Sequence, residues 1–300
     1  MKGRKMTVTV NNEIIKEETV SGCPRVLVRV PDTFSVRQIF DCGQCFRFDP
    51  TPGGEGDNDM SGVALGKLVR FRQEKPGELT VEGSDAQDYQ RLWKKYLGLD
   101  TDYAHLREDI AAHFPAGSVM DEAIEYGRGI RILRQEPFET LISFIISQNN
   151  NIPRIKKLVS ELCRRAGEEI SEGVYAFPTP EAVIVLGEEG LRDMKTGFRA
   201  GYIYDAATKV VSGEIDLDAV AACGSTAEAA DILKRIKGVG PKVAACALLF
   251  GFGRLDAFPV DVWIKKSFAR HFGGSLDINS LGSYAGLAQQ YLFYYERYNN

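Results

Sequence analysis

The chain has 300 residues, a length typical of about two domains, each able to bury a core of its own. A hydrophobic share of 44% and a charged share of 26% are ordinary for globular proteins and exclude a disordered or collagen-like chain. The formal charge of −4 argues against indiscriminate binding of nucleic acid, although it leaves room for a basic patch on one face.

The N-terminal third is patterned as an antiparallel sheet. Short runs of β-branched or aromatic residues alternate with turn residues, which predicts strands at 7–10, 25–30, 45–48, 63–71 and 79–82. The segment 51–62, rich in Gly, Asp and Pro, predicts a hairpin loop.

The hydrophobic period changes to that of helices after the last of these strands. Segments 85–97 and 102–114 carry apolar residues three and four positions apart, and nearly everything downstream follows the same pattern. Strands followed by helices, rather than alternating with them, predict an α+β chain. We expect an N-terminal antiparallel β-sheet domain with flanking helices over residues 1–118 and an all-α domain over residues 119–300.

The start of the chain and its cysteines predict a cytoplasmic protein. The first ten residues lack the apolar segment of a signal peptide, and the longest central apolar stretch, 141–146, is far too short to cross a bilayer. Six cysteines are sparse for this length and do not indicate a disulfide framework. We therefore expect reduced thiols and no membrane partner.

Two helices joined by a tight turn are predicted in the last third. Ser225 and Glu228 form a capping box for the first helix, which is expected to run to Gly238. The segment Gly238–Gly240 then forms the turn, because glycine tolerates backbone conformations that other residues avoid. Pro241 suits the first position of the second helix.

This hairpin has two interpretations. Backbone N–H groups at Gly238, Val239 and Gly240 suit a phosphate of a nucleic-acid backbone, which they would bind without regard to base sequence. The same glycine pattern also fits an ordinary turn in a helical bundle. The glycines alone leave both interpretations open.

A lysine and an aspartate favour a catalytic role for the hairpin. Lys242 lies in the first turn of the second helix, where the positive end of the helix favours an amine able to act as a nucleophile and form a Schiff base. Asp261, nineteen residues later, suits the N-cap of the next helix. A carboxylate near an amine nucleophile can also stabilise a sugar cation and move protons.

Four segments together resemble the 8-oxoguanine DNA glycosylase/lyase branch of the helix–hairpin–helix glycosylases. They are FDCGQCFRF (40–48), SFIISQNNNIPRI (143–155), IKGVGPK (236–242) and PVD (259–261), and the resemblance extends over roughly residues 30–295. It implies a base-excision repair enzyme that flips 8-oxoguanine out of duplex DNA, removes it and cleaves the abasic strand. By resemblance, Lys242 attacks C1′ and drives β-elimination, and Asp261 is the essential carboxylate.

The resemblance also implies a pocket for the lesion. Relative to guanine, 8-oxoguanine carries a proton on N7, so an acceptor opposite N7 discriminates between the two bases. The carbonyl of Gly43 would be this acceptor. Phe293 would cover one face of the base, Gln289 would read its Watson–Crick edge, and Cys246 would bound the other face, although core packing alone also explains Phe293 and Cys246.

Four further residues are implied as DNA contacts. Asn149 would fill the space left by the flipped base, and Arg154 and Arg199 would contact the orphaned cytosine. The eukaryotic members carry a histidine two residues after the aspartate, whereas this chain has Trp263, which cannot supply a cation. This departure favours a bacterial or archaeal member of the family. It leaves open how strictly the enzyme requires cytosine opposite the lesion.

The number and spacing of the cysteines argue against a bound metal. Cys42 and Cys45 form a single C-x-x-C without a partner pair, which disfavours a zinc site, and the cysteines end at Cys246, which disfavours the iron–sulfur branches of the superfamily. We expect no cofactor, and a cation held by hairpin carbonyls would be structural. The alternatives are a helix–hairpin–helix glycosylase for another damaged base, a non-catalytic DNA-binding module, and a helical scaffold for protein partners.

The charge is unevenly spread along the chain. Residues 234–270 contain eight Lys or Arg against two Asp or Glu, a local balance of +6 within a total of −4. We therefore expect a nucleoid-associated monomer whose partner is double-stranded DNA containing 8-oxoguanine opposite cytosine. DNA should bind mainly at the hairpin, and the affinity for DNA should fall as salt is added.

Overall fold

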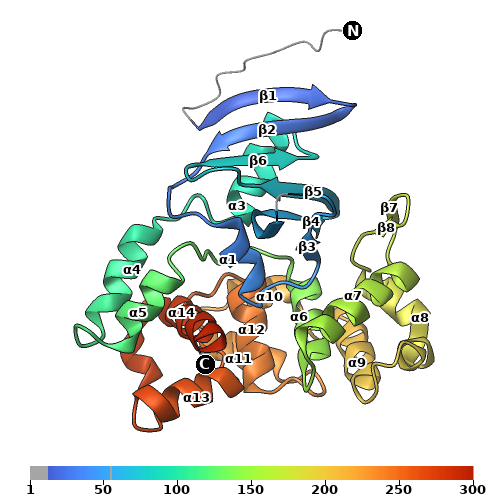
Figure 1. Cartoon of the computed structure of the whole chain (residues 1–300). Coiled ribbons are helices and arrows are strands. Elements are labelled where there is room, and N and C mark those ends of the chain that lie inside the picture. Colours follow the sequence, from blue (N-terminus) through green and yellow to red (C-terminus); the bar gives the residue numbers. More distant parts are fainter. Residues whose placement is uncertain (1–12, 55, 300) are drawn as a thin grey trace. The chain divides into compact units, whose positions relative to one another are not determined.

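The computed structural model describes residues 13–54 and 56–299, which pack as two compact units (Figure 1). The first unit contains the described residues up to Tyr103 together with Arg128–Arg134, and the second contains Ala104–Gly127 and the chain from Gln135 onward. The chain therefore passes from the first unit to the second, returns to the first at Arg128–Arg134, and then enters the second again.

The first unit is built on a six-stranded antiparallel sheet with the strand order β1-β2-β6-β5-β4-β3. The strands are β1 (Ile14–Val20), β2 (Cys23–Arg29), β3 (Phe48–Pro50), β4 (Asp59–Ala64), β5 (Lys67–Arg72) and β6 (Glu78–Glu82). Its helical elements are α1 (Val36–Asp41), a 3₁₀ turn (Gly56–Asn58) and a continuous segment of α2 (Ala86–Asp88), a π-helical turn (Tyr89–Trp93) and α3 (Lys94–Tyr96).

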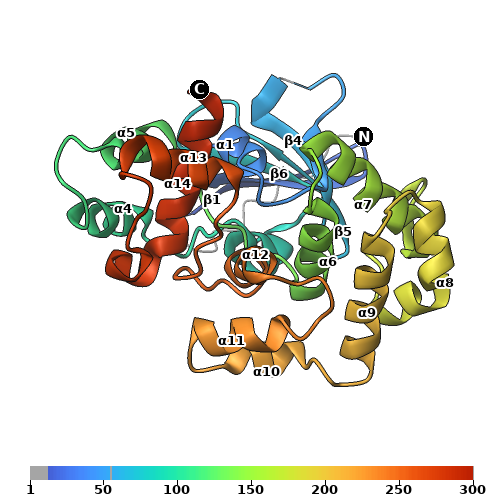
Figure 2. The ribbon, with the colours of Figure 1, turned by 90° about the horizontal axis from the view of Figure 1, so that it is seen from below.

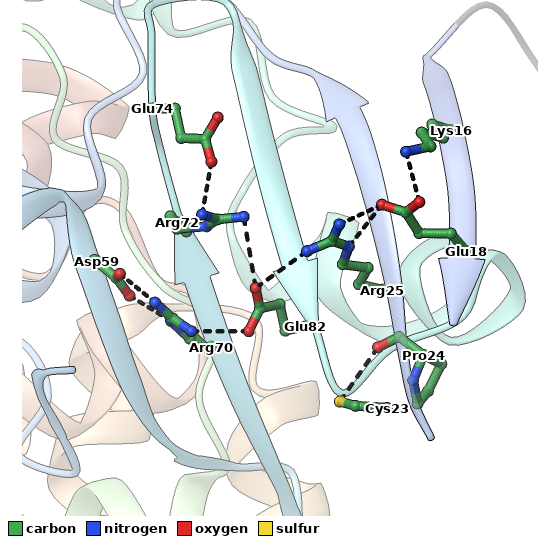
Figure 3. Close-up of polar contacts among 10 residues, drawn as sticks. All are labelled: Lys16, Glu18, Cys23, Pro24, Arg25, Asp59, Arg70, Arg72, Glu74 and Glu82. Atoms are coloured by element: carbon green, nitrogen blue, oxygen red, sulfur yellow. Dashed lines mark hydrogen bonds and ion pairs between the residues drawn. The ribbon is translucent and has the colours of Figure 1, made fainter. Parts of the chain in front are cut away.

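The two faces of this sheet differ because side chains alternate along each strand. On one face Val26, Phe71 and Val81 are fully buried, and Phe71 meets the ring of Trp93 edge-on at 5.6 Å. The other face carries a ladder of charged side chains in which Glu82 accepts from Arg70 at 3.0 Å (Figure 3). The charges on that face are paired with one another and stabilise the strand register.

The predicted strands are partly corrected by the structure. The prediction at 7–10 lies outside the described residues, β1 was not predicted, and 45–48 contributes only Phe48 to a strand. The run 63–71 is divided between β4 and β5 by a turn at Leu65–Gly66, where both residues have positive φ. Leu65 is an apolar residue that continues the alternating pattern of a strand, so the pattern indicated no turn at this point.

The second unit is helical apart from one small hairpin, β7 (Glu169–Ser171) with β8 (Val174–Tyr175). Its helices are α4 (Tyr103–Ala112), α5 (Val119–Tyr126), α6 (Pro137–Ser147), α7 (Ile152–Ala166), α8 (Pro180–Asp193), α9 (Arg199–Val211), α10 (Leu217–Ala222), α11 (Thr226–Leu233), α12 (Pro241–Gly251), α13 (Val262–His271), a 3₁₀ segment (Ile278–Tyr284) and α14 (Ala285–Tyr298). Within the described residues, every helix is too short or too polar to span a bilayer.

The apolar helix α12 forms the centre of this unit. Every residue from Leu141 to Ile146 on α6 and from Ala247 to Phe250 on α12 is buried, and the rings of Phe144 and Phe250 stack at 5.4 Å between these two helices. Figure 2 shows α12 with α6, α11 and α14 around it. The start of α12, which carries Lys242, is thereby held by helices on several sides.

Candidate active site and nucleic-acid interface

The hairpin between α11 and α12 follows the predicted pattern with a longer turn. The hydroxyl of Ser225 accepts the N–H of Glu228 at 3.2 Å, as expected of the cap, but α11 already ends at Leu233. Gly238 has φ +78°, and a Cβ there would overlap the ring of Tyr202. Gly240 has φ −94° and open space where a Cβ would lie. The fold thus requires glycine at position 238 but not at position 240.

The turn offers unused backbone donors. The N–H groups of Gly238 and Gly240 have no acceptor among the described residues, whereas Val239 donates its N–H to the carbonyl of Ile236 at 3.0 Å. The side chain of Val239 is buried, so it shapes the turn from inside. Two free N–H groups beside an open glycine suit an oxygen of a phosphate group.

The amine of Lys242 is held by side chains from two helices. Its Nζ lies 3.4 Å from Oγ of Ser147 at the end of α6 and 5.0 Å from the ring centroid of Phe144. Its charge also lowers the pKa of the Cys246 thiol, one turn further along α12. An amine held by a hydroxyl and an aromatic face has a restricted set of orientations, as a nucleophile requires.

Asp261 caps α13, as predicted. Its Oδ1 accepts the backbone N–H groups of Trp263 at 3.0 Å and Ile264 at 2.9 Å. Burial raises the pKa of this carboxyl above its ordinary value, while these two hydrogen bonds and the charge of Lys242 act in the opposite direction. The structure therefore brings Asp261 into the electrostatic environment of Lys242.

The thiol of Cys246 is buried, and burial raises its pKa to about 11. The positive charge of Lys242 lowers this pKa, and the negative charge of Asp261 raises it. Cys246 is consequently a neutral thiol near neutral pH. It lines the site beside the amine and does not compete with Lys242 as a nucleophile.

Gln289 and Phe293 lie one turn apart on α14. This helix is anchored near its start, where Gly286 donates its N–H to the carbonyl of Leu255 at 2.7 Å. Gln289 is 3% exposed, yet its Oε1 has no hydrogen-bond donor among the described residues. Phe293 is half-buried. A buried, unpaired amide oxygen is rare in folded proteins and marks a position where a ligand can bind.

The loop after α6, which we call the Asn149 loop (residues 148–150), presents an exposed asparagine. Asn149 has φ +54°, a left-handed conformation, and its side chain has no partner among the described residues. Its carbonyl accepts from Nη2 of Arg199 at 3.2 Å, and the carbonyl of Gln148 accepts from Nε of Arg199 at 2.8 Å. The exposed Asn149 side chain fits the predicted role of filling a vacated base position.

The two predicted cytosine contacts differ from each other. Arg154 is exposed and donates to the carbonyl of Lys195 at 3.3 Å. Arg199 is only 6% exposed, and it also donates to the carbonyl of Thr196 at 3.1 Å. Burial and the nearby charge of Arg154 lower the pKa of Arg199. Arg199 can reach a base only by giving up bonds to the Asn149 loop.

Trp263, in the first turn of α13, carries a cation on its ring. Nζ of Lys266 lies 4.3 Å from the ring centroid. Val262, between Trp263 and Asp261, is 66% exposed. A positive charge therefore lies beside Trp263, although tryptophan itself cannot supply one.

The loop around Gly43 belongs to the first unit. Gly43 has φ +75°, and the adjacent Gln44 is fully buried. Nε2 of Gln44 donates to the carbonyls of Ile39 and Arg131, and its Oε1 accepts from the N–H of Leu133, each at 2.8 Å. The side chain of Gln44 thus ties the loop that contains Gly43 to Ile39 and to the segment 131–133.

The cysteines flanking this loop are thiols. Among the described residues, Cys42 and Cys45 are both buried and form no disulfide, and Sγ of Cys42 donates to the carbonyl of Ile39 at 3.2 Å. Across the described ranges, no group of three or more His, Cys, Asp and Glu side chains could hold a metal ion. The expectation that the protein works without a cofactor stays a prediction.

Sequence reasoning missed several residues of the site. Ser147 contacts the Lys242 amine, and Gln44 holds the Gly43 loop. Phe198 is 51% exposed, and Cζ of the Arg199 guanidinium lies 4.4 Å from the centroid of the Phe198 ring. Phe198 could have been found from the predicted role of Arg199, because an aromatic residue next to a DNA contact can stack on or between bases.

Comparisons with known proteins agree with this geometry. Residues 27–141 match the family model "8-oxoguanine DNA glycosylase, N-terminal domain", and residues 142–279 match the model "HhH-GPD superfamily base excision DNA repair protein". A 201-residue alignment with the "N-glycosylase/DNA lyase" of Saccharomyces cerevisiae is 35% identical and covers 62% of this chain but only 52% of the yeast protein.

Two longer alignments extend this likeness. The "N-glycosylase/DNA lyase OGG1" of Arabidopsis thaliana is 30% identical over 85% of this chain and 75% of the plant protein. The crystal structure of the Clostridium acetobutylicum 8-oxoguanine glycosylase/lyase "in complex with dsDNA containing cytosine opposite to 8-oxoG" is 32% identical, covers 100% of this chain and 99% of that chain, and has a TM-score of 0.83. The chain belongs to the 8-oxoguanine DNA glycosylase/lyase family of the helix–hairpin–helix superfamily.

Proposed function

We propose that this protein removes 8-oxoguanine from double-stranded DNA and then cleaves the strand at the abasic site. The observation that carries the proposal is the arrangement around Lys242, whose amine contacts the hydroxyl of Ser147 and shares its electrostatic environment with Cys246 and the half-buried Asp261. A DNA-binding module that only grips phosphates has no use for this arrangement.

The chemistry follows from these groups. Once the Lys242 ammonium has released a proton to water, its nitrogen uses the freed lone pair to form a bond to C1′ of the flipped nucleotide. The bond from C1′ to N9 breaks so that the base leaves with the electron pair. The charge of Asp261 stabilises the cationic sugar that develops as that bond breaks. The bonded nitrogen then loses one of its two protons, and its lone pair expels the ring oxygen O4′, which takes up a proton, so that a protonated Schiff base remains at C1′.

Strand cleavage is the second half of the reaction. The Schiff base draws electrons, so a proton is lost from C2′ and the bond from C3′ to its phosphate oxygen breaks, which is β-elimination. Water then hydrolyses the Schiff base and returns Lys242 as a free amine. No oxidant, reductant or metal ion enters this balance.

Base recognition is assigned to the residues that the sequence predicted. The unpaired Oε1 of Gln289 suits an N–H on the Watson–Crick edge of the lesion, and Phe293 offers a half-buried ring for stacking. The carbonyl of Gly43 remains the proposed acceptor for N7–H, and Cys246 borders the amine. A site with fixed acceptors rejects a base that lacks the matching donor far better than shape alone does.

The DNA interface is assigned to the hairpin and the Asn149 loop. The free N–H groups of Gly238 and Gly240 would bind one phosphate, and Asn149 would occupy the vacated base position. Arg154 is the better placed of the two predicted cytosine contacts because it is exposed. We propose a monomer that acts on 8-oxoguanine opposite cytosine. This is the base pair in the DNA of the Clostridium complex.

Borohydride trapping on a duplex with one 8-oxoguanine:cytosine pair tests this proposal. The wild-type protein should form a covalent adduct, and Lys242→Gln should form none. A wild-type protein that releases the base without forming an adduct would lack the lyase step. Release of another damaged base, but not of 8-oxoguanine, would indicate a glycosylase of different specificity. Repeating the assay with each opposite base measures the preference for cytosine.

A further inference from the structure

One face of α9 contacts both DNA-binding elements of the helical unit. Arg199, Tyr202, Asp205 and Lys209 are spaced three or four residues apart and therefore lie along one side of the helix. We call this set the α9 bracket. Among the described residues, none of its members forms a hydrogen bond with the Lys242 amine, and only Arg199 was predicted to contact DNA.

The first end of the bracket holds the Asn149 loop. Nε and Nη2 of Arg199 both donate to the carbonyl of Gln148, and Nη2 also donates to the carbonyl of Asn149. Arg199 is buried as a residue, which limits the access of water to these bonds. Arg199 thereby fixes the direction in which the left-handed Asn149 presents its side chain.

The other end of the bracket holds the hairpin through three separate contacts. Oδ2 of Asp205 accepts the backbone N–H of Lys237 at 2.7 Å, and Nζ of Lys209 donates to the carbonyl of Arg235 at 2.6 Å. The ring of Tyr202 occupies the space beside Cα of Gly238. The contacts are made with the backbone, so they set the path of the turn whatever its side chains are.

The helix between these two ends is rigidly supported. Ala200, Ile203, Ala206 and Ala207 are fully buried along the adjoining face of the helix. Arg199 and Lys209 are ten residues apart, which corresponds to about 15 Å along a helix. A packed helix of this length transmits a displacement from one end to the other because it cannot bend without exposing its buried side.

We propose that the α9 bracket couples the two elements, so that binding of a phosphate at the hairpin sets the position of Asn149 for extrusion of the base. Tyr202, Asp205 and Lys209 are then positioning residues for base flipping, and Arg199 is the connection to the Asn149 loop. This inference rests on the proposed function, because it assumes that the two elements bind the same duplex.

A double-mutant cycle tests the coupling. Arg199→Met removes the donors at one end, and Asp205→Ala removes the acceptor at the other. Fluorescence of a 2-aminopurine beside the 8-oxoguanine:cytosine pair, followed by stopped flow, measures the rate of extrusion. Each single change should slow extrusion about tenfold, because small displacements of positioned groups have effects of this size. The double variant should be no slower than the slower single variant, since either change disconnects the bracket.

Independent contacts give a different result. Changes at sites this far apart normally act independently, so their factors should multiply within about twofold. Multiplying factors, or no slowing by either single change, overturn the proposal. Arg199→Lys and Asp205→Asn keep a donor and an acceptor at the same places and should recover most of the rate. This recovery would not be expected if the effects came from general loss of packing.

Two additions keep the result interpretable. Thermal melting identifies variants that fail to fold, and Lys209→Met at the more exposed end then replaces Asp205→Ala in the cycle. Borohydride trapping of the wild-type protein on the same duplex is run in parallel. If the wild type forms its Lys242 adduct and the factors multiply, only the coupling is wrong. If the wild type neither extrudes the base nor forms the adduct, the proposed function itself is wrong.

Discussion

The amine of Lys242 lies 3.4 Å from the hydroxyl oxygen of Ser147, which ends α6 ninety-five positions earlier in the chain. The Ser147 hydroxyl donates its own proton to the carbonyl of Phe144 at 2.8 Å, so its oxygen is left to accept from the amine. The orientation of the proposed nucleophile is therefore set by a residue outside its own helix.

Ser147→Ala should slow excision without preventing it. The change removes one hydrogen bond, whose net contribution of about 1 kcal/mol corresponds to a three- to tenfold effect on rate. Single-turnover release of 8-oxoguanine measures the effect, and Ser147→Thr, which keeps the hydroxyl, should stay within about twofold of the wild type. An unchanged rate for Ser147→Ala would show that Cys246 and Phe144 orient the amine without help.

Asp261→Asn should separate stability from activity. Because burial raises the pKa of Asp261, the folded chain binds this proton more tightly than the unfolded chain, and stability falls as the pH rises through the folded pKa. At pH 7.5 the ionised carboxylate therefore lowers stability, and asparagine, which can still accept the N–H groups of Trp263 and Ile264, removes this effect.

The melting temperature of Asp261→Asn should equal or exceed that of the wild type at pH 7.5, and the difference should shrink as the pH falls through the folded pKa. Single-turnover excision at pH 7.5 should drop at least about 100-fold, because the charge that stabilises the sugar cation is lost. A lower melting temperature at pH 7.5 would mean that the carboxylate stabilises the native state.

Gly238→Ala and Gly240→Ala should have opposite effects. Alanine at position 238 would adopt an unfavourable positive φ and overlap Tyr202, which should cost about 2 kcal/mol or more. Alanine at position 240 meets open space with an ordinary φ, so stability should change by less than about 0.5 kcal/mol.

The DNA affinity of Gly240→Ala should nevertheless fall several-fold, because its methyl group would occupy the space proposed for a phosphate. Thermal melting and fluorescence anisotropy with an undamaged duplex measure both quantities, and the affinity of the wild type should also decrease with salt. Unchanged binding by Gly240→Ala would place the phosphate elsewhere.

Gln44→Leu should reduce both stability and discrimination. It leaves the carbonyls of Ile39 and Arg131 and the N–H of Leu133 without the Gln44 amide, which should cost about 3 kcal/mol or more. The Gly43 carbonyl would lose its fixed direction, so the preference for 8-oxoguanine over guanine should fall at least about tenfold.

Gln73→Leu provides a matched control in the same unit. The side chain of Gln73 also joins two backbone groups, donating to the carbonyl of Phe34 at 2.7 Å and accepting from the N–H of Val36 at 3.1 Å. Its loss should lower the melting temperature and leave base preference unchanged. Equal losses of preference in both variants would show that selectivity follows stability rather than the Gly43 loop.

The sequence was most informative where chemistry and local structure coincide. The spacing of Lys242 and Asp261, the cap at Ser225 and the strained turn at Gly238 are local patterns with a physical cause, and the structure contains each of these elements. The change from strands to helices likewise predicted the α+β organisation.

The remaining features depend on contacts that local patterns do not encode. The Ser147–Lys242 contact and the packing of Tyr202 against Gly238 join residues far apart in the chain, and serine and tyrosine occur in many other roles. Strand β1 was not predicted because three consecutive charged residues, Lys16, Glu17 and Glu18, interrupt any alternation of apolar and polar positions. Pairing with β2 rather than intrinsic propensity forms this strand.

The buried amide oxygen of Gln289 has a thermodynamic consequence. Leaving such an acceptor unsatisfied costs about 1–3 kcal/mol. If Gln289 reads the base as proposed, a base that presents an N–H at this point would relieve the cost, whereas a base that presents a carbonyl would add a repulsion. Part of the proposed selectivity would then come from a hydrogen bond that only a matching base completes.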